Sequence, residues 1–112
     1  MRLFIGCSSS DSLDSEIVSD CRELVEEIAS IPGVDLVYGA YNQGLMGVCY
    51  DAFQKQGKKI IGVTPKIYED DIDSFLLDEF YLTDTTIERF HKIYEESDVF
   101  LFLPGGIGTF SE

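Results

Sequence analysis

Three glycine-containing turns in this chain could bind an anion. Each turn follows a short apolar run, and the turns span Gly6–Ser10, Gly39–Gly44 and Gly105–Thr109. Glycine lets backbone N–H groups approach an anion closely, and a helix that follows adds the positive end of its dipole. The net charge of −13 does not exclude such a ligand, because these N–H groups act at contact range. The turns therefore indicate sites for a small molecule that carries phosphate.

The last of these turns carries the richest set of reactive groups. Gly105, Gly106 and Gly108 precede Thr109, and Glu112 follows three positions later. This spacing predicts a phosphate-binding nest with a hydroxyl and a carboxylate on one helix face. A carboxylate there could stabilise positive charge on a sugar or activate a water molecule. The alternative is an ordinary turn from strand to helix, in which Glu112 complements the helix dipole.

The best-known nucleotide motifs match these turns poorly. Gly39–Gly44 has the GxxxxG spacing of an ATP-binding loop, but Leu45 and Met46 replace its Lys and Ser/Thr. The dinucleotide pattern GxGxxG should follow the first strand, where Gly6 has no second glycine at the required position. The sequence therefore disfavours both an ATPase and an NAD-dependent enzyme.

We expect neither a metal nor an organic cofactor. The single histidine and the widely separated Cys7, Cys21 and Cys49 do not form a zinc-binding pattern, and reduced thiols are the simpler interpretation. The acidic run Glu69–Asp73 is typical of a solvated loop, with a divalent cation site as the alternative. Nothing around Lys66 indicates a pyridoxal phosphate site, so lysine decarboxylase chemistry is disfavoured.

Composition limits the class of protein. A chain of 112 residues with 45% hydrophobic positions fits one small globular domain, residues 1–112. The excess of 21 acidic over 8 basic residues disfavours nucleic acid and anionic membrane surfaces as partners. No apolar run is long enough for a membrane span or a secretory signal, so we expect a cytoplasmic protein. A helix beginning at Gly108 would have a single turn, which predicts that the domain is incomplete at its C-terminal end.

The elements that must position the turns alternate between strand and helix. We expect strands near 3–5, 34–38, 58–63, 78–82 and 99–103, and helices near 14–30 and 86–97. A further helix should start between residues 42 and 44 and end at Gly57. Such alternation predicts an α/β fold, a three-layer Rossmann-like open parallel sheet. The expected order places the strand at 58–63 beside 34–38, then 3–5, then 99–103. That order brings the loop of Ser8 next to the loop of Gly105.

Residue spacing also predicts which faces are buried. The expected buried faces are Ile17, Cys21, Leu24 and Ile28 in the first helix, and Met46, Cys49, Tyr50 and Phe53 in the second. The segment from Thr85 to Glu88 fits a capping box at the start of the third helix. The continuous apolar run at 99–103 predicts a strand that is covered on both faces.

In combination, these motifs resemble those of the LOG (Lonely Guy) family. Leu103–Glu112 matches the family's PGGxGTxxE, and Tyr38–Gly47 resembles its YGGGxxGLMG. Gly6–Ser10 resembles GSSSG, and Ile61–Lys66 resembles IGVIPK. The likeness covers nearly the whole chain in the right order. Members of this family are cytokinin riboside 5′-monophosphate phosphoribohydrolases, often described as lysine-decarboxylase-like proteins.

The resemblance implies a reaction and a set of residues. The reaction is hydrolysis of the N-glycosidic bond of a nucleoside 5′-monophosphate, a cytokinin ribotide or AMP, to the free base and ribose 5-phosphate. It implies no cofactor, a small-molecule nucleotide as ligand, and a homodimer. Arg89 and Glu112 take the catalytic positions. The implied substrate-binding residues are Ser8, Gly105, Gly106, Gly108, Thr109 and Glu88.

Some positions depart from the family's pattern. Phe90 replaces a lysine, and Ala40 and Tyr41 replace glycines. These departures leave open a non-catalytic protein of the same fold that binds or carries a nucleotide or molybdenum cofactor. Without the resemblance, an ion pair with Glu88 or Asp84 would be an equally good interpretation of Arg89.

Overall fold

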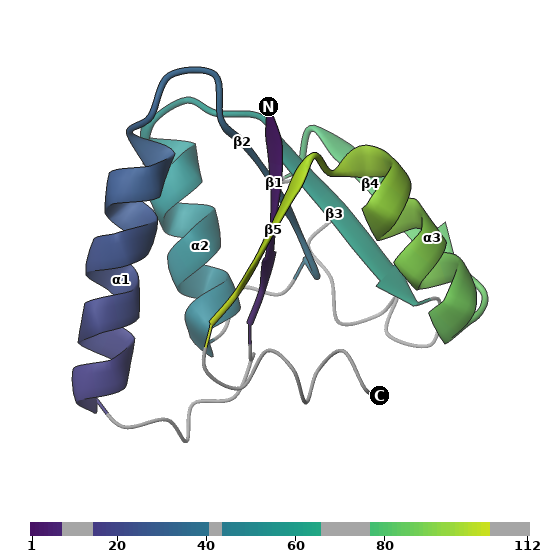
Figure 1. Ribbon diagram of the computed structural model, residues 1–112, viewed down its shortest axis with the longest axis horizontal. Helices are drawn as coiled ribbons and strands as arrows, with labels where there is room; N and C mark the ends of the chain where they lie inside the picture. The colour runs from purple at the N-terminus through teal and green to yellow at the C-terminus, as the bar shows by residue number, and fades with distance from the viewer. Residues whose placement is uncertain (8–14, 41–43, 66–76, 104–112) are drawn as a thin grey trace.

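The computed structural model describes residues 1–7, 15–40, 44–65 and 77–103 (Figure 1). Its strands are β1 (Arg2–Gly6), β2 (Asp35–Tyr38), β3 (Ile60–Pro65), β4 (Glu79–Thr83) and β5 (Val99–Phe102). Its helices are α1 (Ser15–Ala29), α2 (Gly44–Lys55) and α3 (Thr86–Glu96). Each of these elements lies close to its predicted position.

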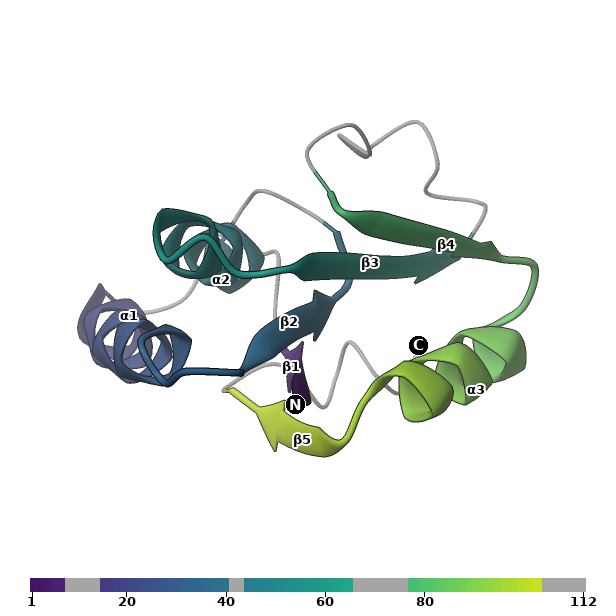
Figure 2. The ribbon, with the colours of Figure 1, turned by 90° about the horizontal axis from the view of Figure 1, so that it is seen from above.

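The strands form one parallel sheet in the order β4-β3-β2-β1-β5 within the described ranges. The predicted order of β3, β2, β1 and β5 is confirmed, and β4 extends the sheet beyond β3. Helices α1 and α2 cover one face of the sheet, and α3 lies on the other (Figure 2). The expected α/β fold with three layers is therefore confirmed.

Alternate strand residues supply a separate core on each face of the sheet. Leu3 and Ile5 of β1 point into the larger cluster beneath α1 and α2, whereas Phe4 points to the α3 side. This follows from the strand period of two residues. The smaller cluster consists of Phe4, Val37, Ile61, Val63 and Ile93.

The buried face of α1 differs from the predicted one. The residues that pack into the core are Val18, Cys21, Val25, Ile28 and Ala29. Ile17 and Leu24 are instead 38% and 42% exposed, so the prediction was wrong for these two positions. Two adjacent stripes of this helix have nearly the same apolar spacing, and only the positions of β1 and α2 decide between them. In α2, all four residues predicted to be buried are buried.

The prediction that β5 is covered on both faces was wrong. Val99, Phe100 and Phe102 are each at least 40% exposed, because β5 is an edge strand in the described part of the sheet. Helix α3 packs mainly over β3 and β4. Tyr94 of α3 stacks on Phe100, with ring centroids 6.3 Å apart, and is itself 74% exposed. An apolar strand therefore need not lie at the centre of its sheet.

The end of α2 follows the predicted glycine signal. Gly57 adopts φ +67°, in the left-handed region. Its N–H donates to the Gln54 carbonyl at 3.0 Å, and Lys58 N–H donates to the Phe53 carbonyl at 3.1 Å. These bonds satisfy carbonyls that the last helical turn would otherwise leave unpaired. None of the helices in the ranges given above has both the length and the apolar character to cross a membrane.

Gly57→Ala should lower the free energy of unfolding by about 1 kcal/mol. A β-carbon at this position would meet no atom within 4 Å, so the cost is that of the backbone conformation alone. Urea denaturation of the wild type and the variant measures this loss in the free energy of unfolding. Gly57→Asn is the matched control and should cost less, because asparagine tolerates the left-handed region better than alanine does. Equal stabilities of wild type and Gly57→Ala would contradict this explanation of the helix end.

A network of charges joins α3 to the sheet at its amino edge. Arg2 forms ion pairs with Glu79 at 3.3 Å and with Glu96. Glu79 also pairs with Lys59 at 2.7 Å and accepts a hydrogen bond from the Tyr81 hydroxyl at 2.8 Å. The Lys59 hydrogen bond and then the Tyr81 hydrogen bond lower the pKa of Glu79. The hydrogen bond that the Tyr81 hydroxyl donates to Glu79 raises the pKa of Tyr81 to about 12.

This network should make stability depend on pH through Glu79. A carboxylate whose pKa is lower in the folded chain adds stability above its ordinary pKa and loses it as the pH falls through the folded pKa. We expect Glu79→Gln to be less stable than wild type at pH 7 and the difference to shrink below about pH 4. Urea unfolding at both pH values tests this. Glu95→Gln, which removes only a 4.0 Å contact to Lys92, should change stability less. A difference that does not vary with pH would exclude the role given to Glu79.

Candidate functional site

The carboxyl ends of β1 and β5 lie side by side. Gly6 is the register partner of Phe102, and Leu103 N–H donates to the Gly6 carbonyl at 2.8 Å. A β-carbon at Gly6 would lie 2.6 Å from the Phe102 ring, so a larger residue at this position would require the ring to move. Strand order reverses here, since β2 lies on one side of β1 and β5 on the other. In open parallel sheets, ligands bind at such a point.

Several predicted site residues lie outside the described residues. They are Ser8, Gly105, Gly106, Gly108, Thr109 and Glu112, together with Tyr41, Lys66 and the acidic run at 69–73. Two of the described segments end at Cys7 and at Leu103, the residues that directly follow the adjacent strands β1 and β5. The roles of these residues stay predictions.

Arg89 is buried at the carboxyl edge of the sheet. It lies on the inner face of α3, one turn before the buried Ile93, and is 7% exposed. Its Nε donates to the Val63 carbonyl of β3 at 3.5 Å. A β-carbon placed on Gly39, just after β2, would lie 3.3 Å from Arg89 Nη2. The guanidinium therefore lies at the ends of β2 and β3.

A guanidinium held in this way has a defined chemical use. Its planar fork of N–H donors matches the oxygens of phosphate or of a sugar. Burial strengthens such contacts because water screens them less. The position of Arg89 thus suits it to bind an anionic or oxygen-rich ligand at the edge where ligands are expected.

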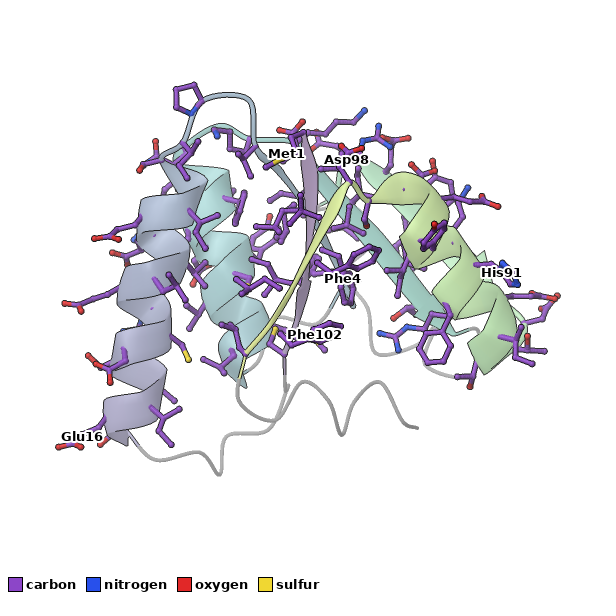
Figure 3. All side chains as sticks on the ribbon, in the orientation of Figure 1. Met1, Phe4, Glu16, His91, Asp98 and Phe102 are labelled. Carbon is purple, nitrogen blue, oxygen red and sulfur yellow. The ribbon has the colours of Figure 1, made fainter. Side chains whose placement is uncertain are left out.

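The other polar residues next to Arg89 on α3 are exposed. Glu88 carries the capping interaction: its N–H donates to Thr85 Oγ1 at 3.1 Å, and its carboxylate accepts from the Asp84 N–H at 2.9 Å. The Thr85 half of the predicted capping box is confirmed; the Glu88 carboxylate bonds to the N–H of Asp84, one residue before the N-cap. The substrate-binding role of Glu88 stays a prediction. His91 is exposed on the outer side of α3 (Figure 3).

Sequence reasoning missed the buried hydroxyls beside Arg89. Thr64 Oγ1 donates to the Gly39 carbonyl at 2.7 Å, and Thr83 Oγ1 donates to the Thr64 carbonyl at 3.3 Å. The available signal was a hydroxyl residue that directly follows the apolar run 60–63. Next to Gly39, Ala40 adopts φ +70°, a strained conformation for a residue with a β-carbon.

The cysteines gather in the core. Cys7, Cys21 and Cys49 are free and buried, and the sulfurs of Cys7 and Cys49 are 3.9 Å apart. The hydrogen bond with Cys7, together with burial, raises the pKa of Cys49. This disfavours the thiolate that nucleophilic chemistry needs. Within the part of the chain that the structure describes, no cluster of histidine, cysteine, aspartate and glutamate could hold a metal ion.

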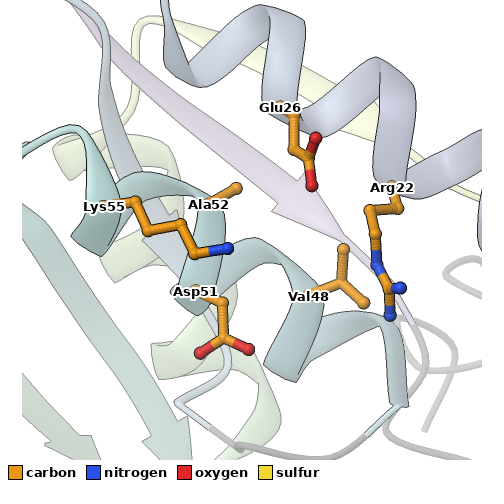
Figure 4. Close-up of a pocket in the computed structure, with 6 residues that line it drawn as sticks. All are labelled: Arg22, Glu26, Val48, Asp51, Ala52 and Lys55. Carbon is orange, nitrogen blue, oxygen red and sulfur yellow. The ribbon is translucent and has the colours of Figure 1, made fainter.

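A surface groove lies between α1 and α2 (Figure 4). Its volume is about 380 Å³, and its lining consists of Arg22, Glu26, Val48, Asp51, Ala52 and Lys55. These helices cover the face of the sheet opposite to α3, so the groove is separate from Arg89. Its charged side chains come from both helices, and we assign no substrate to it.

Comparison with solved structures gives the same fold. A molybdenum cofactor carrier protein from Chlamydomonas reinhardtii superposes with a TM-score of 0.73 at 22% identity. The match covers 96% of this chain and 64% of the carrier chain.

Sequence comparison identifies the family. A cytokinin riboside 5′-monophosphate phosphoribohydrolase of Arabidopsis thaliana, LOG2, is 30% identical over 99% of this chain and 52% of its own. A probable phosphoribohydrolase of the same kind from Oryza sativa, LOGL6, is 32% identical over 99% of this chain and 44% of its own. This chain thus spans about half the length of these relatives. A family model described as "Possible lysine decarboxylase" matches residues 46–112, more than half of the chain. The chain therefore belongs to this family, the LOG family.

Proposed function

We propose that this protein hydrolyses the N-glycosidic bond of a nucleoside 5′-monophosphate. The products are the free base and ribose 5-phosphate, and the substrate is a cytokinin ribotide or AMP. Family membership and the names of the relatives support this reaction. The observation that carries it is the buried guanidinium of Arg89, held at the carboxyl edge of the sheet, at the ends of β2 and β3.

In the proposed reaction, water adds to C1′ of the ribose as the bond to the base breaks. The bonding electrons leave with the base, which takes up a proton, and C1′ develops oxocarbenium character. Glu112 is the carboxylate that stabilises this charge and orients or deprotonates the water. The N–H groups of Gly105–Thr109 hold the 5′-phosphate, with the Thr109 hydroxyl as a further donor.

Arg89 supplies the fixed positive charge of this proposed site. Its guanidinium binds phosphate or ribose oxygens, or assists the departing base, and Ser8 and Glu88 add contacts to the nucleotide. Burial against Val63 limits the motion of the side chain, so little entropy is lost when the ligand binds. The homodimer and the cytoplasmic location that the sequence predicts stay predictions.

A base-release assay tests the proposal. The protein is incubated with AMP and, separately, with N6-isopentenyladenosine 5′-monophosphate, and free base is measured by chromatography. We expect release by the wild type and a loss of roughly 100-fold or more in Glu112→Gln and in Arg89→Ala. Arg22→Ala is the matched control, because Arg22 is exposed on α1 and lines only the groove on the opposite face.

The outcomes of this assay separate enzyme from carrier. Binding of AMP without release of base would contradict the hydrolase and favour the carrier alternative. The likeness to the molybdenum cofactor carrier shows a shared fold and is not evidence for a shared function. Unchanged release by Glu112→Gln would remove the carboxylate from the mechanism while leaving the reaction in place.

A further inference from the structure

The buried polar residues of the described chain form a single cluster. Within the ranges that the structure covers, these residues are Thr64, Thr83 and Arg89, which are 1%, 7% and 7% exposed. Burying a polar group costs free energy unless the group is hydrogen-bonded, so buried polar side chains normally have hydrogen-bond partners. Here all three residues bond to backbone at the carboxyl ends of β2 and β3.

The contacts of this cluster converge on residue 64. Arg89 Nε bonds to the carbonyl of the peptide that joins Val63 to Thr64. The Thr64 carbonyl accepts from Thr83 Oγ1, and the Thr64 hydroxyl donates to the Gly39 carbonyl at 2.7 Å. The peptide that accepts this hydrogen bond from Arg89 is thus bonded to the Gly39 carbonyl through the Thr64 side chain.

The hydroxyl of Thr64 bonds the end of β3 that Arg89 contacts to that turn. The preceding residues of β3, Ile60, Ile61 and Val63, are apolar and buried, and valine has the shape of threonine without its oxygen. The space could therefore be filled without a hydroxyl. What the hydroxyl adds is a hydrogen bond that holds the carbonyl of Gly39, the residue next to Met46 and the Arg89 guanidinium.

The turn that Thr64 holds is also strained. Ala40, next to Gly39, adopts φ +70°, and strain of this kind persists only where surrounding contacts maintain it. A β-carbon at Gly39 would lie 3.0 Å from Met46 Cε and 3.3 Å from Arg89 Nη2, so movement of this turn changes the surroundings of the guanidinium.

We propose that Thr64 is a positioning residue: its hydroxyl fixes the Gly39 carbonyl and so sets where Arg89 presents its guanidinium at the carboxyl edge of the sheet. The catalytic consequence rests on the proposed function, since Thr64 acts only through Arg89. The structural consequence does not depend on any activity.

Kinetics of base release test the catalytic consequence. Thr64→Val removes the hydroxyl and keeps the shape, and should lower kcat/KM by about 10- to 100-fold through misplacement of Arg89. Thr64→Ser keeps the hydroxyl and should retain a kcat/KM close to that of wild type. Ile61→Val, a buried change in the same strand with no hydrogen bond altered, measures the effect of lost packing alone. Equal losses in Thr64→Val and Thr64→Ser, or in Thr64→Val and Ile61→Val, would overturn the proposal.

A spectroscopic measurement tests positioning without activity. The Arg89 Nε–H resonance can be followed by proton–nitrogen NMR of protein labelled at arginine, with Arg89→Lys to assign it. We expect the resonance to shift, and its exchange with water to quicken, in Thr64→Val but not in Thr64→Ser or Ile61→Val. An unchanged Arg89 resonance in folded Thr64→Val would disprove the positioning role. If wild type released no base, the proposed function would fail, and this spectrum alone would still decide the role of Thr64.

Discussion

The parallel pairing of β1 with both β2 and β5 is the constraint on which the candidate site depends. Because all strands of the described sheet run the same way, their carboxyl ends share one edge. Because the order reverses at β1, the chain leaves β1 and β5 at neighbouring points of that edge. Residues far apart in sequence can then act on one ligand. Gly6 leaves room for the Phe102 ring on the neighbouring strand, since a β-carbon there would lie 2.6 Å from it.

Helix α3 is held to the sheet differently at its two ends. At the amino edge of the sheet, Arg2 and Glu79 form exposed or half-buried ion pairs, which solvent weakens. At the carboxyl edge, Arg89 is buried and bonded to the backbone of β3. A buried charge tolerates displacement poorly, because losing its partners costs the full price of desolvation. The buried attachment therefore lies at the edge where the proposed chemistry requires a cation.

The two faces of the sheet are unequally covered. Beneath α1 and α2 lies the larger core, which includes the free cysteines, whereas α3 covers only a small cluster over β1, β2 and β3. The rest of the α3 side exposes aromatic residues of β5, with Tyr94 stacked on Phe100. Local sequence pattern could not foresee this, since an apolar strand looks the same whether its neighbours cover it or not.

The sequence alone determined the strand and helix pattern and the order of β3, β2, β1 and β5. It also determined the cap at Thr85 and the end of α2 at Gly57. These features follow from local spacing and backbone preference. It also singled out Arg89 through family resemblance. Only the tertiary structure decided that α1 buries Val25 rather than Leu24, because two stripes on that helix have equal periods. It alone showed that Arg89 bonds to the carbonyl of Val63 and lies next to Gly39, because contacts between distant segments leave no periodic trace in a sequence.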